Sequence, residues 1–581
     1  MSSAAREVYR AGPARWELAP AVDEAAAAEL AAALNLPTAM GRILLARGIH
    51  EADEAKQLLR PLLTHLKAPS VLVDLDKAVD RIRFAIQRGE TVFVHGDYDV
   101  DGICAAALLT RWIRRLGGTV VPFVPHRIRD GYDLSSAGIE RAVAAGAGLL
   151  VTVDCGIVAH EAVNQAIHAG LEVIVTDHHT PGSELPAAHA VVNPNRADDT
   201  SDSGTLCGAA VSFKLCQALA ERAGVAFEEL IPDLDLVALA TVADLVPLRD
   251  ENRVITRYGL RAIAQTTKVG LRALLDVCGL QGRTLDAGQL GFQVAPRINA
   301  VGRMGDANDA LELLLTDDPA EARRLAAHLD RLNTERKEED ERTLEAAFDQ
   351  LASSFDPARD FGVVLAGEGW HPGVIGIVAS RVVERIHRPV VMIALDGEKG
   401  RGSARSIPGF DLLGAIAQNR ELLGRFGGHR QAAGLDLTLS NLGAFREGFN
   451  RACRAELEGQ ELIPRLRGEL DLSPSDATLD LADLAEYLGP HGMGNPRPVF
   501  VARGVTVVSA REVGRGHLKV ELSDETGRCE GIGFGLVERL DPTRIVGSQM
   551  DALFRLKVNE YRGHRSPQMM LLDLRVAGTG G

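Results

Sequence analysis

The sequence predicts a multidomain α/β protein in which two α/β domains are joined by a long helix and followed by a small β-barrel. Short apolar strands alternate with helical segments over 76–260, which is typical of a mainly parallel sheet covered on both faces. The alternation returns over 360–457 with many glycines and indicates a second α/β domain. Residues 319–350 are charged and lack Gly and Pro after the first position, which predicts the joining helix. After residue 468, short strands recur with turns between them, and this spacing predicts an OB-fold barrel.

The length of 581 residues corresponds to three to five domains of about 100–200 residues each. The changes in pattern along the chain predict five parts. These are an N-terminal helical segment (1–75), a first α/β domain (76–265), a helical connector (266–352), a second α/β domain (353–465) and the C-terminal barrel (466–581).

The composition predicts a soluble protein of the cytoplasm. Hydrophobic residues make up 46% and charged residues 25% of the chain, which is ordinary for a globular protein. No apolar run approaches the roughly 18 residues of a membrane span, and Met1–Ala19 lacks the apolar core of a signal peptide. The seven cysteines are scattered and form no CxxC pair, which argues against a disulfide framework or a thiolate zinc site.

The net charge of −15 by itself argues mildly against nucleic-acid binding, because a polyanion needs positive surface. Net charge is an average, however. Carboxylates gathered around metal ions contribute negative charge that the ions then neutralise. Local clusters of Arg and Lys are therefore a better indicator of nucleic-acid binding than the net charge.

The most informative motif is His95–Gly102, with the sequence HGDYDVDG. It follows a short predicted strand (91–94) and precedes a predicted helix (103–116), and ligand sites of open α/β sheets lie at such strand ends. Three carboxylates in five residues repel one another unless a cation binds them. The motif therefore predicts a metal site at this edge of the sheet.

The same motif could instead begin a calcium-binding EF-hand loop, because such loops start with the pattern DxDxDG. That loop needs Glu at its twelfth position, which counted from Asp97 is Leu108. An EF-hand loop also follows a helix, whereas this motif follows a strand. Both observations disfavour calcium.

Two further predicted strands run into polar motifs, Asp154-Cys155-Gly156 and Asp177-His178-His179, and a further acid is Asp244. A single Asp after a strand is equally well explained as a helix cap. When acidic residues follow three strands of one sheet, helix capping is a poor explanation for all of them. Carboxylate and imidazole ligands suit Mn²⁺ or Mg²⁺, and two such ions are a common device for hydrolysing phosphodiesters.

The second α/β domain carries two glycine-rich motifs, Gly369–Gly376 and Gly427–Gly434, with Arg401–Ser406 between them. A lone Gly-Gly-His is more often only a turn. Glycines also let the backbone approach an anion, and Arg binds phosphate in a bidentate manner. Together the motifs favour phosphate binding.

The four acidic motifs resemble those of the DHH phosphoesterases, and the second α/β domain resembles the DHHA1 domain that accompanies them. Arg127 with Gly131-Tyr132, and Pro296–Arg303, resemble further segments of the exonucleases in this family. Where that pattern usually has Gly, this chain has Asp133, from which we expect little consequence.

The resemblance implies two divalent ions, Mn²⁺ or Mg²⁺, and a role for each matching residue. One ion would be held by His95, Asp99 and Asp154, and the other by Asp101, Asp154, His178 and Asp244. His179, Asp97 and Asp177 would be catalytic: His179 facing the phosphate, Asp177 orienting the imidazoles, and Asp97 in an open role. The implied substrate-binding residues are Arg127, Tyr132, Arg297, Asn299, Arg303, His371, Ser403, Arg405, Gly428 and His429.

The resemblance also implies an activity, namely 5′ to 3′ degradation of single-stranded DNA to mononucleotides in recombination and repair. The expected partners are single-stranded DNA, a single-strand-binding protein and a helicase, with no membrane, and the expected state is a monomer. Two alternatives remain at this point. One is a DHH phosphodiesterase acting on short RNA or cyclic dinucleotides, and the other is a nucleic-acid-binding scaffold without catalysis.

Overall fold

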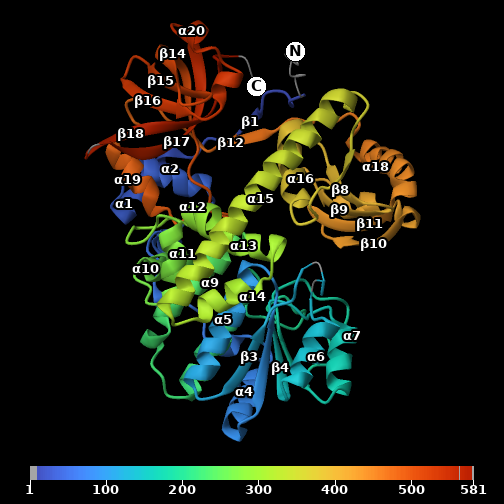
Figure 1. The fold of residues 1–581 in the computed structure, drawn as a ribbon. Helices are drawn as coiled ribbons and strands as arrows, with labels where there is room; N and C mark the ends of the chain where they lie inside the picture. The colour runs from blue at the N-terminus through green and yellow to red at the C-terminus, as the bar shows by residue number, and fades with distance from the viewer. Residues whose placement is uncertain (1–8, 128, 132, 562, 579–581) are drawn as a thin grey trace. The chain divides into compact units, whose positions relative to one another are not determined.

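The computed structural model describes residues 9–127, 129–131, 133–561 and 563–578 (Figure 1). The chain forms two compact units. Of the described residues, the large unit contains 18–330 and 467–578, and the small unit contains 9–17 and 331–466. Among the described residues, none of the helices combines the length and apolarity that crossing a bilayer requires.

The large unit contains the predicted parallel sheet. Its strand order is β3-β2-β4-β5-β6, and every neighbouring pair is parallel. The buried strands are apolar along their length, as strands covered on both faces must be. The strands are β2 (Thr91–Gly96), β3 (Thr119–Phe123), β4 (Ala147–Val153), β5 (Glu172–Thr176) and β6 (Ala190–Val192).

Helices cover both faces of this sheet. One face packs on α6 (Ser136–Ala144) and α7 (His160–His168) through a shared apolar cluster. On the other face, α5 (Val100–Arg115) packs against α8 (Gly208–Arg222) and α9 (Leu234–Ala243). The helix α5 is buried over most of its surface because it lies between the sheet and these two helices. It fixes the direction in which the HGDYDVDG loop leaves β2.

The predicted joining helix is confirmed as α15 (Pro319–Ser354), a single helix of 36 residues that runs from the large unit into the small one. Before it, the chain is helical, as predicted. The helices in this stretch are α11 (Val269–Val277), α13 (Ala295–Met304) and α14 (Asn308–Leu315).

The small unit contains a five-stranded sheet of order β10-β11-β9-β8-β7. Only β7 and β8 are parallel, so this sheet is mixed, unlike the first. Tight turns join the antiparallel pairs β8–β9 and β10–β11, whereas β9 and β11 pair across the segment that contains α17 (Leu412–Ala417) and β10. The strands are β7 (Val363–Glu368), β8 (Val390–Asp396), β9 (Lys399–Arg405), β10 (Leu423–Gly428) and β11 (Ala432–Thr438).

The predicted barrel is confirmed in the C-terminal part of the large unit. Its five strands follow the order β14-β15-β16-β18-β17, and pairing of β14 with β17 closes the ring. The N-terminal helices α1 to α3 contribute Leu30, Met40 and Leu59 to the same apolar core. The strands are β14 (Phe500–Val513), β15 (His517–Ser523), β16 (Arg528–Gly533), β17 (Gln549–Tyr561) and β18 (His564–Val576), and the helices are α1 (Glu24–Leu34), α2 (Thr38–Ala46) and α3 (Ala52–Leu59).

Candidate metal centre

The acidic loop after β2 is held by the start of α5. Asp99 is the N-cap of that helix, and its carboxylate accepts the N–H groups of Asp101 (2.9 Å) and Gly102 (3.2 Å). A Cβ on Gly102 would lie 2.4 Å from the backbone nitrogen of Asp97. Only glycine therefore lets the loop fold back onto the helix, which leaves Asp97 and Asp101 almost fully buried.

Asp154, at the end of β4, is buried with a left-handed backbone (φ +64°). Asp and Asn tolerate this conformation better than most residues. The backbone at this position therefore limits which residue types can occupy it, in addition to any requirement for a negative charge. The N-terminus of α8 packs directly on it. A Cβ on Gly208 would lie 2.5 Å from the Asp154 carboxylate, so close packing here requires glycine.

The Asp177-His178-His179 turn is organised by its first residue. The Asp177 carboxylate accepts the backbone N–H groups of His178 (2.7 Å) and His179 (3.0 Å). It also lies 2.7 Å from Nδ1 of His179. Burial alone would lower the pKa of His179, but the hydrogen bond and charge of Asp177 raise it to about 9. His179 is therefore cationic at neutral pH in the metal-free protein.

The strand ends meet around His178, which confirms the expectation that residues following separate strands converge. Its Nε2 lies 3.1 Å from Asp154 Oδ1, 3.7 Å from Asp101 Oδ2 and 3.7 Å from Asp244 Oδ2. Ligand-type atoms lie within 4.8 Å of one another in three sets. These sets are Asp154, His178 and His179; Asp101, His178 and Asp244; and Asp97, Asp99 and Asp154.

Buried atoms without partners show that the centre fits cations. Among the described residues, four such atoms of this centre have no hydrogen-bond partner: Nε2 of His95, Oδ1 of Asp97, Oδ1 of Asp154 and Nε2 of His178. Leaving buried polar atoms unpaired costs about 1–3 kcal/mol each, so their concentration here calls for an explanation. Oxygen and imidazole donors suit Mn²⁺ and Mg²⁺, and coordination would satisfy these atoms.

The charges of the centre also favour cations. Burial, followed by repulsion from neighbouring carboxylates, raises the pKa of Asp97 and Asp154 well above the usual range. Burial together with Asp101 and Asp99 raises the pKa of Asp244 to about 8. Burial lowers the pKa of His178, which keeps this imidazole neutral and able to ligate a metal. The cluster is therefore costly without cations and well suited to them.

His95 lies at the end of β2, fully buried, with its ring edge-on to Phe123 at a centroid distance of 5.3 Å. Burial lowers the pKa of His95 to about 4, so the ring is neutral. Among the described residues, His95 belongs to none of the three sets above. Its predicted role as a ligand stays a prediction.

Sequence reasoning missed the groups that position these ligands. The backbone N–H groups of Gly208 and Ala209, at the start of α8, donate to the two oxygens of Asp101 at 2.6 and 2.7 Å. Asn193 and Asn195 donate to the carbonyls of His179 and His178 at 3.0 and 2.5 Å. The signal for the asparagines was available, because Asn193-Pro194-Asn195 follows the last strand at the same sheet edge.

Several predicted substrate-binding residues lie around the acidic loop. The Arg127 guanidinium lies 5.0 Å from the centre of the Tyr98 ring, and Asn299 Oδ1 accepts the N–H of Val100 at 3.3 Å. Arg303, one helical turn beyond Asn299, lies on the same face of α13. Tyr132 lies outside the described residues.

Arg297 has structural partners of its own. It forms an ion pair with Asp330 at 2.8 Å and donates to the carbonyl of Gln293 at 2.6 Å. The ion pair ties α13 to α15. Its predicted contact with substrate stays untested.

Asp133, where the family pattern usually has Gly, adopts the left-handed conformation (φ +73°) that glycine favours. Its carboxylate accepts the N–H of Leu134 at 2.8 Å. Burial and the neighbouring Asp177 raise its pKa. The residue thus keeps the backbone shape and adds a half-buried acid near Asp177.

The small unit brings its predicted phosphate-binding residues to the N-terminus of α16 (Ile375–Ile386). Arg405 and Ser403 are on β9, with Arg405 Nη1 3.2 Å from Ser403 Oγ. A Cβ on Gly376, in the first turn of α16, would lie 2.9 Å from Arg405 Nη2. A cationic side chain, a hydroxyl and a helix N-terminus together are typical of an anion site.

The other glycine-rich segments border this position. The pairing of β9 with β11 sets Arg405 opposite Ala432, directly after the turn that contains His429. Gly428 has φ +139°, a conformation open to glycine, and His429 is exposed. In the turn before α16, His371 Nδ1 accepts the N–H of Gly373 at 3.0 Å.

Comparison with known protein families gives three matches along the chain. The family model of the DHH family, N-terminal domain, matches residues 91–241, and that of the DHHA1 domain matches residues 360–455. The model of the RecJ OB domain matches residues 469–573. The first two matches define the class of protein, a metal-dependent phosphoesterase of the DHH type.

Full-length relatives narrow this class. The single-stranded-DNA-specific exonuclease RecJ of Dickeya dadantii (strain 3937) is 38% identical over 93% of this chain and 96% of its own length. The crystal structure of RecJ from Thermus thermophilus in complex with Mn²⁺ matches with a TM-score of 0.82 and 33% identity, over 98% of this chain and 80% of that one. The corresponding complex with Mg²⁺ matches with a TM-score of 0.78 and 31% identity, over 98% and 79%. The chain belongs to the RecJ family.

Binding of Mn²⁺ to the metal-free protein should release protons at about pH 7, because Asp244 carries a proton there and must lose it to ligate. Apparent affinity should rise with pH through about 8. Calorimetry in buffers of different ionisation enthalpy measures the proton count. Asp244→Asn should release fewer protons, and equal release by both proteins would contradict the assignment.

Asp154→Asn should stabilise the metal-free protein at neutral pH. Asparagine fits the left-handed backbone and removes a buried charge whose pKa is raised in the folded state. The gain should shrink as the pH falls through about 4 and vanish at lower pH, where the carboxyl is protonated both folded and unfolded. Thermal unfolding should shift upward by about 1 °C per kcal/mol of repulsion removed, because a unit of this size unfolds with a large entropy change.

The matched control for this variant is Asp317→Asn, whose side chain is 81% exposed, and it should leave the midpoint nearly unchanged. A lower midpoint for Asp154→Asn without metal would show that the acidic cluster is not under electrostatic strain.

Proposed function

We propose that this protein is a single-stranded-DNA-specific exonuclease that degrades DNA from the 5′ end to mononucleotides with two divalent ions. The observation that carries the proposal is the set of buried, partnerless ligand atoms at the convergence of strand ends. That centre occurs in a chain whose RecJ relatives bear the name of this activity and whose Thermus relative is described with Mn²⁺ and with Mg²⁺. A scaffold without catalysis would have no use for such a costly cluster.

The residues divide between the ions as follows in this proposal. Asp101, Asp154, His178 and Asp244 hold one ion, and Asp154 is shared with the other. His95 and Asp99 complete the second ion's ligands. Asp97 lies within ligand distance of Asp99 and Asp154, which supports a ligating rather than a distant role. Two divalent ions bound here supply activation of water and neutralisation of phosphoryl charge.

The protein's own side chains then orient the substrate and stabilise charge. The His179 ring, oriented by Asp177, supports contact with a non-bridging phosphate oxygen, where negative charge develops during hydrolysis. Asp177 is a positioning residue, since its carboxylate fixes the ring and the backbone of the turn. Arg127 and Arg303 provide further positive charge near the acidic loop.

The small unit binds the 5′ end of the DNA strand in this proposal. Arg405, Ser403 and the first turn of α16 form the anion site described above, which suits a terminal phosphate. Anchoring the end while hydrolysis occurs elsewhere would release one nucleotide at a time. We assign 76–265 to catalysis, 353–465 to end binding and 466–581 to single-strand binding. Residues 1–75 and 266–352 would be structural. A monomeric state and contacts with a single-strand-binding protein or helicase stay predictions.

With Mn²⁺, an internally labelled single strand should be degraded to mononucleotides only when its 5′ end is free. Strands blocked at the 3′ end should be degraded as fast as unblocked ones, and duplex DNA should resist. Product analysis by gel and mass spectrometry measures both outcomes. Loss of nucleotides from the 3′ end would keep the hydrolytic chemistry and overturn the polarity.

Arg405→Ala should weaken the use of 5′-phosphorylated strands about 10- to 100-fold in kcat/KM, the range of one or two charge-assisted hydrogen bonds. Strands ending in a 5′-hydroxyl should be affected much less, so the preference for phosphate disappears. The control is Arg451→Ala, whose side chain is 74% exposed on α18 (Leu442–Leu457). If Arg405→Ala instead reduced Mn²⁺ binding and left the preference intact, the end-binding role would be wrong.

A further inference from the structure

The loop that presents Asp244 differs from the other ligand-bearing segments, because a helix rather than a strand precedes it. Asp244 follows α9, and the loop ends where α10 (Asp250–Ala264) begins. Leu245 and Asp250 both have left-handed backbones, with φ of +59° and +46°. Such strain persists only where other contacts hold the backbone, and the Leu245 side chain is 65% exposed. The position of Asp244 therefore depends on contacts made elsewhere along this loop.

Asn252, in the first turn of α10, makes these contacts. Its side chain is fully buried. Its Nδ2 donates to the carbonyl of Pro247 at 3.1 Å and to the carbonyl of Thr205 at 2.6 Å. Within the described chain, its Oδ1 has no hydrogen-bond partner, so the two donated bonds are what a buried amide provides here. Asn252 thus joins the loop of Asp244 to the loop that precedes α8.

The loop before α8 leads to a group that holds another proposed ligand. Three residues after Thr205, the N–H of Gly208 donates to the Asp101 carboxylate at 2.6 Å. Asp101 and Asp244 belong to the same set of ligand-type atoms. The bridge from Pro247 to Thr205 through Asn252 therefore fixes the spacing of two carboxylates that could share one ion.

The neighbouring Glu251 fixes the start of α10 against the same segments. Its buried carboxylate forms an ion pair with Lys214 of α8. It also accepts the backbone N–H of Lys67 at 2.8 Å and the hydroxyl of Ser203 at 3.3 Å. Asn252 is therefore attached to a rigid base, and its two hydrogen bonds transmit the position of that base to the loop of Asp244.

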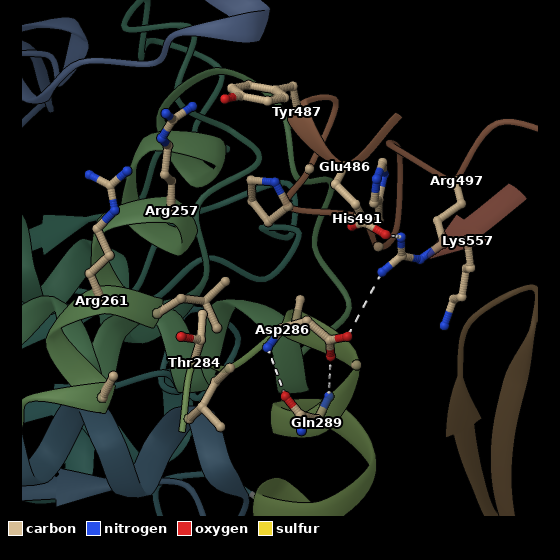
Figure 2. A pocket seen from close by; sticks show the side chains of 18 of the residues that line it. Arg257, Arg261, Thr284, Asp286, Gln289, Glu486, Tyr487, His491, Arg497 and Lys557 are labelled. Atoms are coloured by element: carbon tan, nitrogen blue, oxygen red, sulfur yellow. Dashed lines mark hydrogen bonds and ion pairs between the residues drawn. The ribbon is translucent and has the colours of Figure 1, made fainter. Parts of the chain in front are cut away.

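The later turns of α10 face a different surface. Arg257 and Arg261 line a cavity of about 1220 Å³, to which neither Asn252 nor Asp244 contributes (Figure 2). Because Asn252 is buried and lies outside this cavity, replacing it removes no exposed charge or contact surface. An effect of its replacement on metal binding would pass through its two carbonyl partners.

We propose that Asn252 is a positioning residue of the metal centre, which sets Asp244 at the distance from Asp101 that a shared divalent ion requires. It acts through the carbonyl groups of Pro247 and Thr205 and contacts neither the ion nor DNA. The inference rests on the proposed function and adds to it a residue that determines how tightly one of the two ions is bound.

Asn252→Ala should weaken binding of one Mn²⁺ ion about 10- to 100-fold and affect the other much less, because residues that orient metal ligands contribute about this much to affinity. Titration of the metal-free protein with Mn²⁺, with the unbound ion followed by electron paramagnetic resonance, measures both affinities without DNA. Degradation of single-stranded DNA by this variant should require more Mn²⁺, and most of the rate should return at saturating Mn²⁺. Unchanged affinity for both ions would overturn the proposal.

The matched control is Asn419→Ala, which removes a buried amide from the small unit. Nδ2 of Asn419 donates to the carbonyl of Ala415 at 3.1 Å. Both alanine variants should lower the thermal unfolding midpoint, but Asn419→Ala should bind Mn²⁺ as the unaltered protein does. If the two variants lost Mn²⁺ affinity equally, the role of Asn252 would be structural only.

Asn252→Asp keeps the size of the side chain and so tests the hydrogen bonds rather than the space they occupy. A carboxyl group at this position can donate to at most one of the two carbonyl oxygens. This variant should therefore also bind one Mn²⁺ ion more weakly than the unaltered protein. Affinity equal to that of the unaltered protein would show that the donated bonds are not the cause.

The route through Asp244 is tested by combining two substitutions. Asn252→Ala should have little further effect on Mn²⁺ affinity in a protein that already carries Asp244→Asn, because the ligand that Asn252 positions has been lost. Additive losses would show that Asn252 acts elsewhere in the centre and would contradict the proposal.

The outcomes separate this inference from the proposed function. If the unaltered protein degrades single-stranded DNA and Asn252→Ala binds both ions as tightly, the role of Asn252 is wrong and the exonuclease assignment stands. If the unaltered protein binds Mn²⁺ but degrades no strand, and Asn252→Ala weakens one ion, the positioning role stands and the exonuclease assignment is wrong.

Discussion

Mutual repulsion among buried carboxylates is the constraint on which the catalytic half of the structure depends. Asp97, Asp101 and Asp154 are almost fully buried at one edge of the sheet, where burial and like charge disfavour ionisation. The surrounding backbone holds them there: the N-terminus of α8 donates to Asp101, and Gly208 leaves room for Asp154. The left-handed backbone of Asp154 is a local strain of the kind that persists where function requires it.

The fold, and the meeting of the acidic motifs at one edge of the sheet, could be predicted from the sequence because local patterns specify both. Continuous apolar strands with helices between them specify a parallel sheet, and the carboxyl ends of parallel strands share one edge. Asp154 and Asp177 had to lie near the HGDYDVDG loop once β2, β4 and β5 were neighbours, and they do. The cap explanation for an Asp after a strand was also partly right, since Asp99 caps α5 while lying within ligand distance of Asp154.

What the sequence did not disclose depends on distant contacts. The N-terminal helices carry no chemical motif, and their role appears only when Met40 and Leu59 pack into the barrel core. The alternation of strand and helix predicted a second α/β domain but not its strand directions, and three of its four strand pairs are antiparallel.

The net charge of −15 illustrates why total charge is a poor guide to ligands. Part of the negative charge lies in the buried cluster, where bound cations would cancel it. Another part is paired locally, as Asp286 and Glu486 are with Arg497. A phosphate backbone responds to the potential within about one Debye length, roughly 8–10 Å at physiological salt, so unpaired cations nearby outweigh distant acids. An acidic protein can therefore bind a polyanion wherever its folding leaves arginines and lysines without carboxylate partners.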